Sequence, residues 1–222
     1  LDVVGDKKVV VFNSDVLCRK NKEDQLTSAS FGGDATAITV FEHDDKASDI
    51  YMNLYNDGKE RETLIMHAGG FRMPRTPETA IPRDIGDGTI KSYDDLWMDG
   101  SKVFNFVQKE VPPMIDEIVS YANLSKEDIQ WYLFHQPNKF MLQKLADKLQ
   151  VPWDKVPMNV VENFGNSSGS TIPVAITGNL ADEMLTGQYK CCLAGFGAGL
   201  SWSSMIMDLG NMSFCEMITS VY

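Results

Sequence analysis

The fold class is indicated most clearly by the stretch Trp131-Tyr132-Leu133-Phe134-His135-Gln136-Pro137-Asn138. Its first four residues form an apolar run with the length of a buried strand, and the run ends at a histidine, two amides and a proline. In open α/β sheets, binding and catalytic groups collect at the carboxyl ends of the strands. The stretch therefore predicts a buried strand that presents His135 at the edge of a sheet.

The segments around this strand predict a layered α/β domain. Apolar residues recur at helical spacing from Phe140 to Leu149, and Pro137 suits the start of that helix. Upstream, a helical stripe runs from about 99 to 121, and we expect the pair Pro112-Pro113 to kink or break it. The other predicted elements are a strand near 158–160, a helix over 174–185, and strands over 189–194 and 200–209.

The first ninety residues are organised differently. Apolar runs over 8–15 and 33–42 predict two interior strands. Residues 50–92 carry glycine turns and prolines without clear periodicity, so we expect loops and short strands there. The chain thus divides into residues 1–49, an excursion over 50–92, and a main domain over 93–222.

Composition and charge exclude several classes of protein. A hydrophobic content of 43% in 222 residues suits a packed core. The net charge of −11 argues against nucleic-acid binding, which needs a basic face. No apolar run reaches the roughly 20 residues that span a bilayer, and the first residues lack the features of a signal peptide. We therefore expect a cytoplasmic protein without a membrane partner.

The four cysteines do not have metal-ligand spacing, so no metal site is expected. The adjacent pair Cys191-Cys192 lies in an apolar strand and indicates packing. Cys18 follows a strand in a polar loop, and Cys215 also reads as structural. None of the four begins a helix among small residues, the context that activates a thiolate nucleophile.

Two glycine-rich stretches lie near element ends. Residues 195–199 read GFGAG, but a strand follows them, whereas a dinucleotide fingerprint opens a helix. They are interpreted as a turn whose backbone faces a site. Residues 165–170 read GNSSGS before a helix, which is typical of a hydrogen-bonding corner. Each motif alone, His135 included, is more often structural than functional.

Together these motifs resemble a known family. FHQPN at 134–138, FGNSSGSTIP at 164–173 and GFGAGLSW at 195–202 are similar, in order and spacing, to the C-terminal half of β-ketoacyl-acyl-carrier-protein synthase III. These thiolase-fold ketosynthases start fatty-acid synthesis. The resemblance runs from about residue 8 to 209, with further matches at 31–37, 67–70 and 98–104. It implies a thiolase-like layered α/β/α fold with a mixed sheet, in which 1–49 ends the N-terminal half and 93–222 forms the C-terminal domain.

The resemblance also implies a reaction and a site. His135 and Asn166 match the histidine and asparagine of the family's Cys-His-Asn set, and Asn138, Phe196 and Gly197 match substrate-contacting positions. The reaction is a decarboxylative Claisen condensation of an acyl thioester with malonyl-acyl carrier protein. Acyl-CoA and acyl carrier protein are then substrates and partners, no cofactor is required, and the full protein is a homodimer. An N–H on His135 and one on Asn166 would stabilise the enolate oxygen.

The chain departs from the family pattern in two places. The family's nucleophilic cysteine belongs to the N-terminal half, and no cysteine here matches it. We therefore expect a fragment that holds the decarboxylation half of the site and is inactive in isolation. Where the family often has an arginine after its histidine motif, this chain has Lys139-Phe140. Docking of an acidic carrier would then rely on Lys139, Lys144 and Lys148, which equally fit a solvated helix face.

Two alternatives stay open. One is a secondary-metabolism homologue that performs acyl transfer, with the histidine as general base, or a polyketide-type condensation. The other is a non-catalytic thiolase-like subunit that pairs with an active partner. A subunit of that kind has no need for both His135 and Asn166, so their presence favours the enzyme.

Overall fold

The computed structural model describes residues 8–18, 32–86 and 88–219 of the chain. Its main sheet has four strands in the order β3, β10, β9, β8. Strands β3 (Tyr51–Asn56), β10 (Ser201–Gly210) and β9 (Gln188–Gly197) are antiparallel neighbours. Strand β8 (Trp131–Phe134) pairs with β9 in parallel, so the sheet is mixed as predicted.

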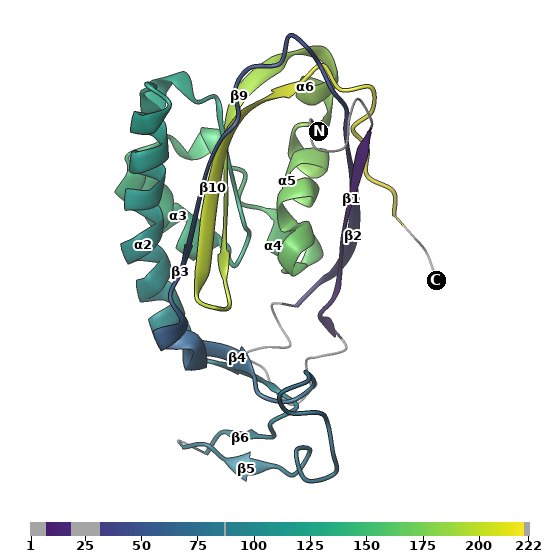
Figure 1. Ribbon diagram of the computed structural model, residues 1–222, viewed down its shortest axis with the longest axis vertical. Coiled ribbons are helices and arrows are strands. Elements are labelled where there is room, and N and C mark those ends of the chain that lie inside the picture. Colours follow the sequence, from purple (N-terminus) through teal and green to yellow (C-terminus); the bar gives the residue numbers. More distant parts are fainter. Residues whose placement is uncertain (1–7, 19–31, 87, 220–222) are drawn as a thin grey trace.

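Helices cover both faces of this sheet and produce three layers (Figure 1). Helices α2 (Gly100–Tyr121) and α3 (Lys139–Leu149) lie on one face, and α5 (Thr171–Asn179) and α6 (Ala181–Thr186) lie on the other. Strand β8 is apolar on both sides because Tyr132 and Phe134 pack in the core of α2 and α3, while Leu133 packs in the core of α6. The predicted layered α/β arrangement is confirmed.

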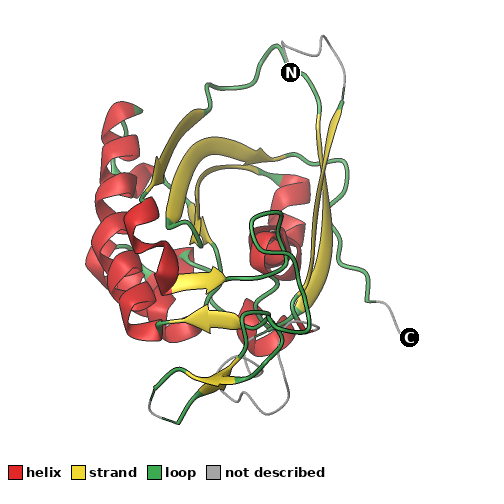
Figure 2. Cartoon of the chain, turned by 60° about the horizontal axis from the view of Figure 1, so that its bottom comes forward, coloured by secondary structure: helices red, strands yellow, loops and turns green. Residues whose placement is uncertain are grey.

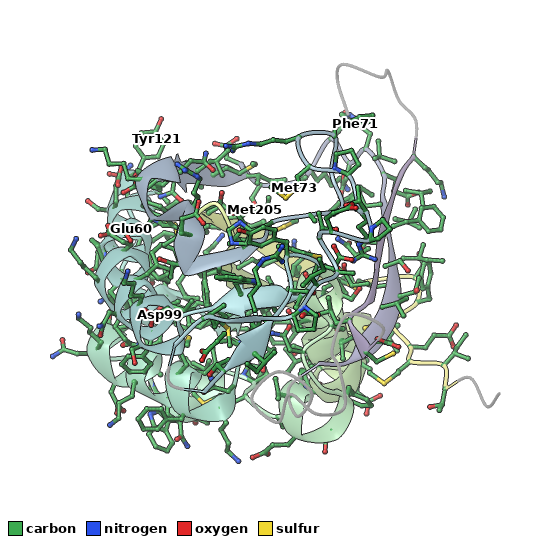
Figure 3. All side chains as sticks on the ribbon, turned by 90° about the horizontal axis from the view of Figure 1, so that it is seen from below. Glu60, Phe71, Met73, Asp99, Tyr121 and Met205 are labelled. Atoms are coloured by element: carbon green, nitrogen blue, oxygen red, sulfur yellow. The ribbon has the colours of Figure 1, made fainter. Side chains whose placement is uncertain are left out.

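Helix α2 runs unbroken through Pro112 and Pro113, so the predicted break is wrong. Pro112 has no N–H to donate to the carbonyl of Gln108, four residues earlier. That carbonyl instead accepts a hydrogen bond of 2.6 Å from the Lys148 ammonium on α3. The neighbouring helix thus satisfies the group that the proline leaves free. At the other end, the side chain of Asp99, which is labelled in Figure 3, caps the helix. Its carboxylate accepts a hydrogen bond from the Lys102 N–H.

Two further elements differ from expectation. The strand predicted near 158–160 is wrong, because α4 (Val160–Phe164) begins there and its Val160 is buried against α5. The single helix predicted over 174–185 is two helices, which meet where Leu180 leaves the helical conformation (φ −130°). Helix α5 can include Pro173 because this proline lies in its first turn. The N–H groups of a first turn have no partner within the helix, so the N–H that proline lacks is not needed there.

Strands β1 (Val9–Val16) and β2 (Asp34–Phe41) form a two-stranded antiparallel ribbon, separate from the main sheet. The ribbon lies beyond α5 (Figures 1 and 2). The expectation that both strands are interior is wrong for the described residues, because Phe12 is 67% exposed and Ile38 is 55% exposed. Ala35 packs towards α5, so the ribbon is covered on one side only.

The excursion begins after β3, which joins the main sheet. It contains η2 (Gly58–Thr63), the paired strands β4 (Leu64–Met66) and β7 (Leu96–Met98), and the paired strands β5 (Arg83–Asp84) and β6 (Ile90–Lys91). His67 packs edge-on against Trp97, with ring centroids 4.7 Å apart, so this histidine is part of an aromatic cluster. The fully exposed Phe71 lies at the periphery (Figure 3).

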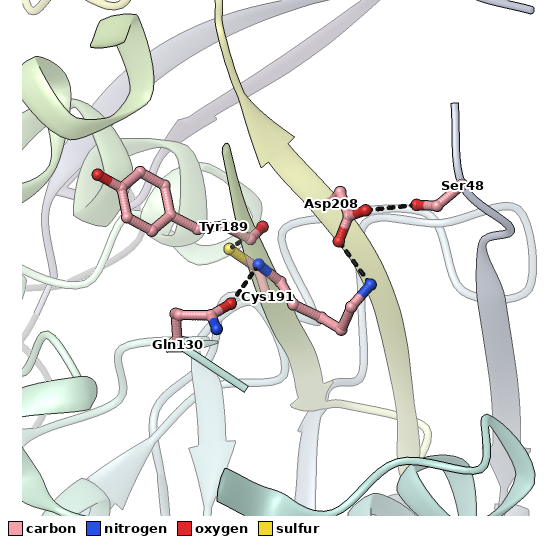
Figure 4. Close-up of polar contacts among 6 residues, drawn as sticks. Ser48, Gln130, Tyr189, Cys191 and Asp208 are labelled. Atoms are coloured by element: carbon pink, nitrogen blue, oxygen red, sulfur yellow. Dashed lines mark hydrogen bonds and ion pairs between the residues drawn. The ribbon is translucent and has the colours of Figure 1, made fainter. Parts of the chain in front are cut away.

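Polar contacts tie the strands together at the end of the sheet where β9 begins (Figure 4). The Lys190 N–H donates to Gln130, the Lys190 ammonium lies 2.6 Å from Asp208, and Ser48 donates to the same carboxylate. The candidate site lies at the opposite end of the sheet, where β8 and β9 finish. Short helices η3 (Lys126–Asp128), η4 (Trp153–Lys155) and η5 (Ser168–Ser170) complete the described elements. Within these residues, no helix has the length and apolar character needed to cross a membrane.

Candidate active site

His135 lies where the sequence predicts it, directly after β8. Its backbone N–H donates to the Ala194 carbonyl, which extends the pairing with β9 by one residue. The Phe196 ring meets the imidazole edge-on, with centroids 5.5 Å apart. On the other side, Nδ1 of His135 lies 2.8 Å from Oγ1 of Thr171. The ring is therefore held by one apolar and one polar neighbour.

Burial sets the charge of His135. It lowers the pKa of the imidazole from 6.5 to about 4, because the protonated ring loses solvation inside the protein. The backbone of Ser168 acts in the opposite direction and raises the pKa. The net effect is a neutral imidazole at pH 7, with one N–H and one lone pair on its two nitrogens.

Asn166 is positioned by a close crossing of two backbone segments. Its carbonyl accepts a hydrogen bond of 2.9 Å from the Gly33 N–H. A Cβ added to Gly33 would lie 2.1 Å from the Phe164 carbonyl oxygen, and one added to Gly165 would lie 2.6 Å from the Gly32 carbonyl oxygen. Gly165 also has φ +72°, which disfavours other residues. The glycine entry of β2 therefore fixes the loop that carries Asn166.

Ser168 connects the two candidate catalytic side chains. Its N–H donates to Oδ1 of Asn166 at 2.9 Å, and its carbonyl accepts from the Thr171 hydroxyl at 2.8 Å. Thr171 in turn contacts His135. Ser168 and Thr171 thus link Asn166 to His135 through a chain of three hydrogen bonds. Sequence reasoning missed Thr171, since its partner His135 lies 36 residues earlier.

The ribbon of β1 and β2 makes hydrogen bonds to the loop that follows Asn166. The Ser170 hydroxyl, which is fully buried, lies 3.0 Å from the Asn13 carbonyl and 3.1 Å from the Ala35 carbonyl. The Gly169 N–H donates to the Asp15 carboxylate at 3.1 Å. The ribbon is therefore part of the scaffold of the site, although it stands apart from the main sheet.

The three residues expected at the substrate have different surroundings. Oδ1 of Asn138 caps α3 by accepting from the Met141 N–H at 2.8 Å, and its amide NH₂ is left for a substrate. Phe196 is buried against His135. Gly197 ends β9, and a Cβ placed there would meet nothing within 4 Å. A ligand therefore has room to approach the backbone at Gly197.

The lysines of α3 already have partners within the chain. Lys139 lies 3.0 Å and 3.1 Å from the two carboxylate oxygens of Glu162. Lys144 lies 3.6 Å from Asp147, and Lys148 binds the carbonyl of Gln108. An acidic carrier would have to compete with these contacts, so the electrostatic attraction expected at this helix is weaker than the sequence indicates.

The described cysteines do not form an activated nucleophile at this site. Burial raises the pKa of Cys191 and of Cys192 to about 12, and it also raises the pKa of Cys215. These thiols stay protonated at neutral pH, which makes them poor nucleophiles. Cys18 is exposed, and its thiol donates to the Asp34 carboxylate. The burial of Cys191, Cys192 and Cys215 agrees with their interpretation as structural residues.

Comparison with known proteins finds a family match over the segment that carries His135 and Asn166. Residues 119–209 match the family described as 3-oxoacyl-[acyl-carrier-protein (ACP)] synthase III C terminal, and this range contains both His135 and Asn166. Over this region the chain is similar to that family. The predicted family and the thiolase-like fold are therefore confirmed, and the name synthase III is used below for the family.

Relatives and solved structures extend the similarity over most of the chain. The beta-ketoacyl-[acyl-carrier-protein] synthase III of Microcystis aeruginosa is 30% identical over 210 residues, which are 92% of this chain and 60% of the relative. The 3-oxoacyl-(acyl-carrier protein) synthase of Burkholderia xenovorans superposes with a TM-score of 0.85 at 30% identity, covering 96% of this chain and 59% of that protein. The priming beta-ketosynthase of the R1128 polyketide pathway superposes with a TM-score of 0.71 at 25% identity. The superposition covers 92% of this chain and 57% of that protein. The chain thus spans about three fifths of the length of these proteins.

Proposed function

We propose that this chain carries the histidine and asparagine of a synthase III enzyme. The reaction is the condensation of an acyl thioester with malonyl-acyl carrier protein, with loss of CO₂, at the start of fatty-acid synthesis. The enzyme is an acyltransferase, its substrates are acyl-CoA and malonyl-acyl carrier protein, and its reaction uses no cofactor. His135 and Asn166 are the catalytic residues, and Asn138, Phe196 and Gly197 line the substrate path.

One observation carries this proposal: Ser168 and Thr171 hold the His135 ring and the Asn166 amide in a single hydrogen-bonded unit. Histidine and asparagine side chains combined in this way supply polar groups at the end of the sheet where β8 finishes. Phe196 closes one side of that point. A thioester carbonyl placed there meets groups suited to an oxygen on which charge develops.

Decarboxylation needs stabilisation of that oxygen. The bond between the malonyl methylene and its carboxylate breaks, CO₂ leaves, and the electron pair moves into an enolate whose charge rests on the thioester oxygen. A fixed N–H aimed at this oxygen lowers the barrier, and losing one such donor costs roughly a hundred- to a thousandfold in rate. The Asn166 amide keeps its N–H at any relevant pH, which suits this role.

The first experiment is mass spectrometry of the intact native gene product that contains this chain. Incubation with acyl-CoA should acylate one cysteine, and adding malonyl-acyl carrier protein should remove the acyl group as β-ketoacyl product. Acylation at none of its cysteines would contradict the proposal and favour the non-catalytic partner subunit. The isolated 222-residue chain should yield no product, because burial keeps the thiols of Cys191, Cys192 and Cys215 protonated and Cys18 does not match the family's nucleophilic cysteine.

Variants test the two catalytic residues. Asn166→Ala and His135→Ala should each reduce decarboxylation of the malonyl thioester roughly a hundred- to a thousandfold. The matched control is Asn163→Ala, since Asn163 is an exposed asparagine three residues from Asn166. Unchanged decarboxylation in Asn166→Ala would refute the assignment.

A second candidate is a polyketide-type or acyl-transfer enzyme of secondary metabolism. The similarity to the R1128 priming ketosynthase supports it, at 25% identity. Both candidates share the site, so they differ in the donor they accept. Comparing turnover of short acyl-CoA donors with turnover of carrier-bound starter units separates them.

The proposal also includes the protein's compartment and assembly. We place the protein in the cytoplasm, where its four free thiols stay reduced. We further propose a homodimer, supported by the exposed apolar side chains of Phe12 on β1 and of Met52 and Leu54 on β3. Sedimentation of the native gene product at twice its monomer mass is the expected result, and a monomer would contradict it.

A further inference from the structure

The Thr171 hydroxyl is the meeting point of three groups in the candidate site. Its Oγ1 lies 2.8 Å from Nδ1 of His135, 2.8 Å from the Ser168 carbonyl oxygen and 3.3 Å from the Gln136 backbone nitrogen. Thr171 is almost wholly buried, so protein groups rather than bulk water satisfy its hydroxyl. The hydrogens at this hydroxyl determine what His135 presents to a substrate.

Counting donors and acceptors places those hydrogens. A threonine hydroxyl has one hydrogen and two lone pairs. The Thr171 and Ser168 oxygens are 2.8 Å apart, a distance that needs a hydrogen between them, and a carbonyl can only accept. The hydroxyl hydrogen therefore points to Ser168. One lone pair faces the N–H of Gln136, and the other receives a hydrogen from Nδ1 of His135.

The Asn166 amide is oriented by a similar constraint. A backbone N–H can only donate, so the Ser168 N–H at 2.9 Å must face the oxygen of the amide, Oδ1. The Nδ2 end of Asn166 is then turned away from Ser168. In the part of the chain that the structure describes, neither Nδ2 of Asn166 nor Nε2 of His135 has a hydrogen-bond partner. These two atoms are the ones left for a ligand.

We propose that Thr171 is a positioning residue that keeps the single hydrogen of neutral His135 on Nδ1. Nε2 then faces the site as a lone pair, whereas Asn166 faces it with an N–H. The inference rests on the proposed function, and it gives Asn166 and His135 different roles at the thioester. Asn166 donates to the developing oxyanion, whereas Nε2 of neutral His135 can accept a hydrogen bond but donates none. This changes the expectation that neutral His135 donates directly alongside Asn166.

Nitrogen NMR of the ¹⁵N-histidine-labelled 222-residue chain tests the assignment directly. The chain has three histidines, and His135→Gln identifies the His135 signals by their loss. At pH 7 we expect a pyrrole-type shift for Nδ1 and a pyridine-type shift for Nε2. A pyridine-type Nδ1 with a hydrogen on Nε2 would overturn the proposal. This readout is independent of catalysis, so an inactive protein with the predicted tautomer would refute the proposed function and leave the inference standing.

Two variants test whether Thr171 is responsible. Thr171→Val keeps the shape of the side chain but removes the acceptor, and the His135 hydrogen should redistribute towards Nε2. Thr171→Ser restores the hydroxyl and should restore the wild-type shifts. The shifts of His43 and His67 should stay constant and serve as internal controls. An unchanged tautomer in folded Thr171→Val would refute the role of Thr171. If Thr171→Val does not fold, Thr171→Ser provides the test. A tautomer in Thr171→Ser that differs from wild type would then refute the role of the hydroxyl.

Discussion

Gly33 and Gly165 cross so closely that neither position has room for a side chain. A Cβ on Gly33 would fall 2.1 Å from the Phe164 carbonyl oxygen and 2.8 Å from the Gly165 backbone. The Gly33 N–H bonds the Asn166 carbonyl at the same point. This crossing joins β2 to the loop of the candidate site, so the ribbon and Asn166 are positioned together.

Gly33→Ala should therefore destabilise the chain by about 1–3 kcal/mol, because backbone atoms must shift to make room. Urea unfolding followed by circular dichroism measures this free energy. Gly58→Ala is the matched control, since a Cβ at Gly58 meets nothing within 4 Å, and it should stay within about 0.5 kcal/mol of wild type. Equal stability of the two variants would contradict the crossing.

The low pKa of His135 predicts a pH-dependent stability. The ring titrates near 6.5 when unfolded and near 4 when folded, so the unfolded state binds the proton more readily between these values. The free energy of unfolding should fall as the pH drops from 6.5 towards 4, by at most about 3 kcal/mol. His135→Gln should lose this component. An identical pH dependence in wild type and variant would show that His135 is not buried as described.

The hydrogen bond from Lys148 to the Gln108 carbonyl should stabilise α2 at its prolines. Lys148→Met keeps the apolar stem but removes the donor, so we expect a loss of about 1 kcal/mol in unfolding free energy. Lys144→Met, on the same helix, removes an exposed ion pair and should change it by less than about 0.5 kcal/mol. If Lys144→Met costs as much as Lys148→Met, the special role of Lys148 is refuted.

The cysteines should differ sharply in reactivity. Cys18 is exposed and should react with iodoacetamide in the folded chain, whereas Cys191 and Cys192 should stay unmodified until the chain unfolds. Peptide mass spectrometry with and without urea gives the order of labelling. Early modification of Cys192 would contradict its burial in the core.

The strand ending at His135, the helix after it and the glycine-rich corner at 165–170 were all predictable from the sequence. Each depends on a local pattern: an apolar run that stops, apolar residues at helical spacing, and small residues before a helix. The order and spacing of three such motifs also sufficed to recognise the family, which the similarity over residues 119–209 confirms.

Other features depended on residues that are far apart in the chain. Helix α2 continues through Pro112 and Pro113 because Lys148 donates to the Gln108 carbonyl, which the missing N–H of Pro112 leaves without its helical partner. Lys148 lies forty residues after Gln108 in the chain. The ribbon is half exposed because α5 covers only one of its sides. Thr171 meets His135 only when α5 and β8 pack together, 36 residues apart.

Local patterns in the sequence are thus enough to place the residue types that stand at the edge of the sheet, because periodicity and turn chemistry act between near neighbours. Which nitrogen of His135 faces the site, and which end of Asn166 is free, depends on the tertiary structure. Those choices follow from hydrogen bonds to Thr171 and Ser168, and such bonds form only once distant segments are folded against each other.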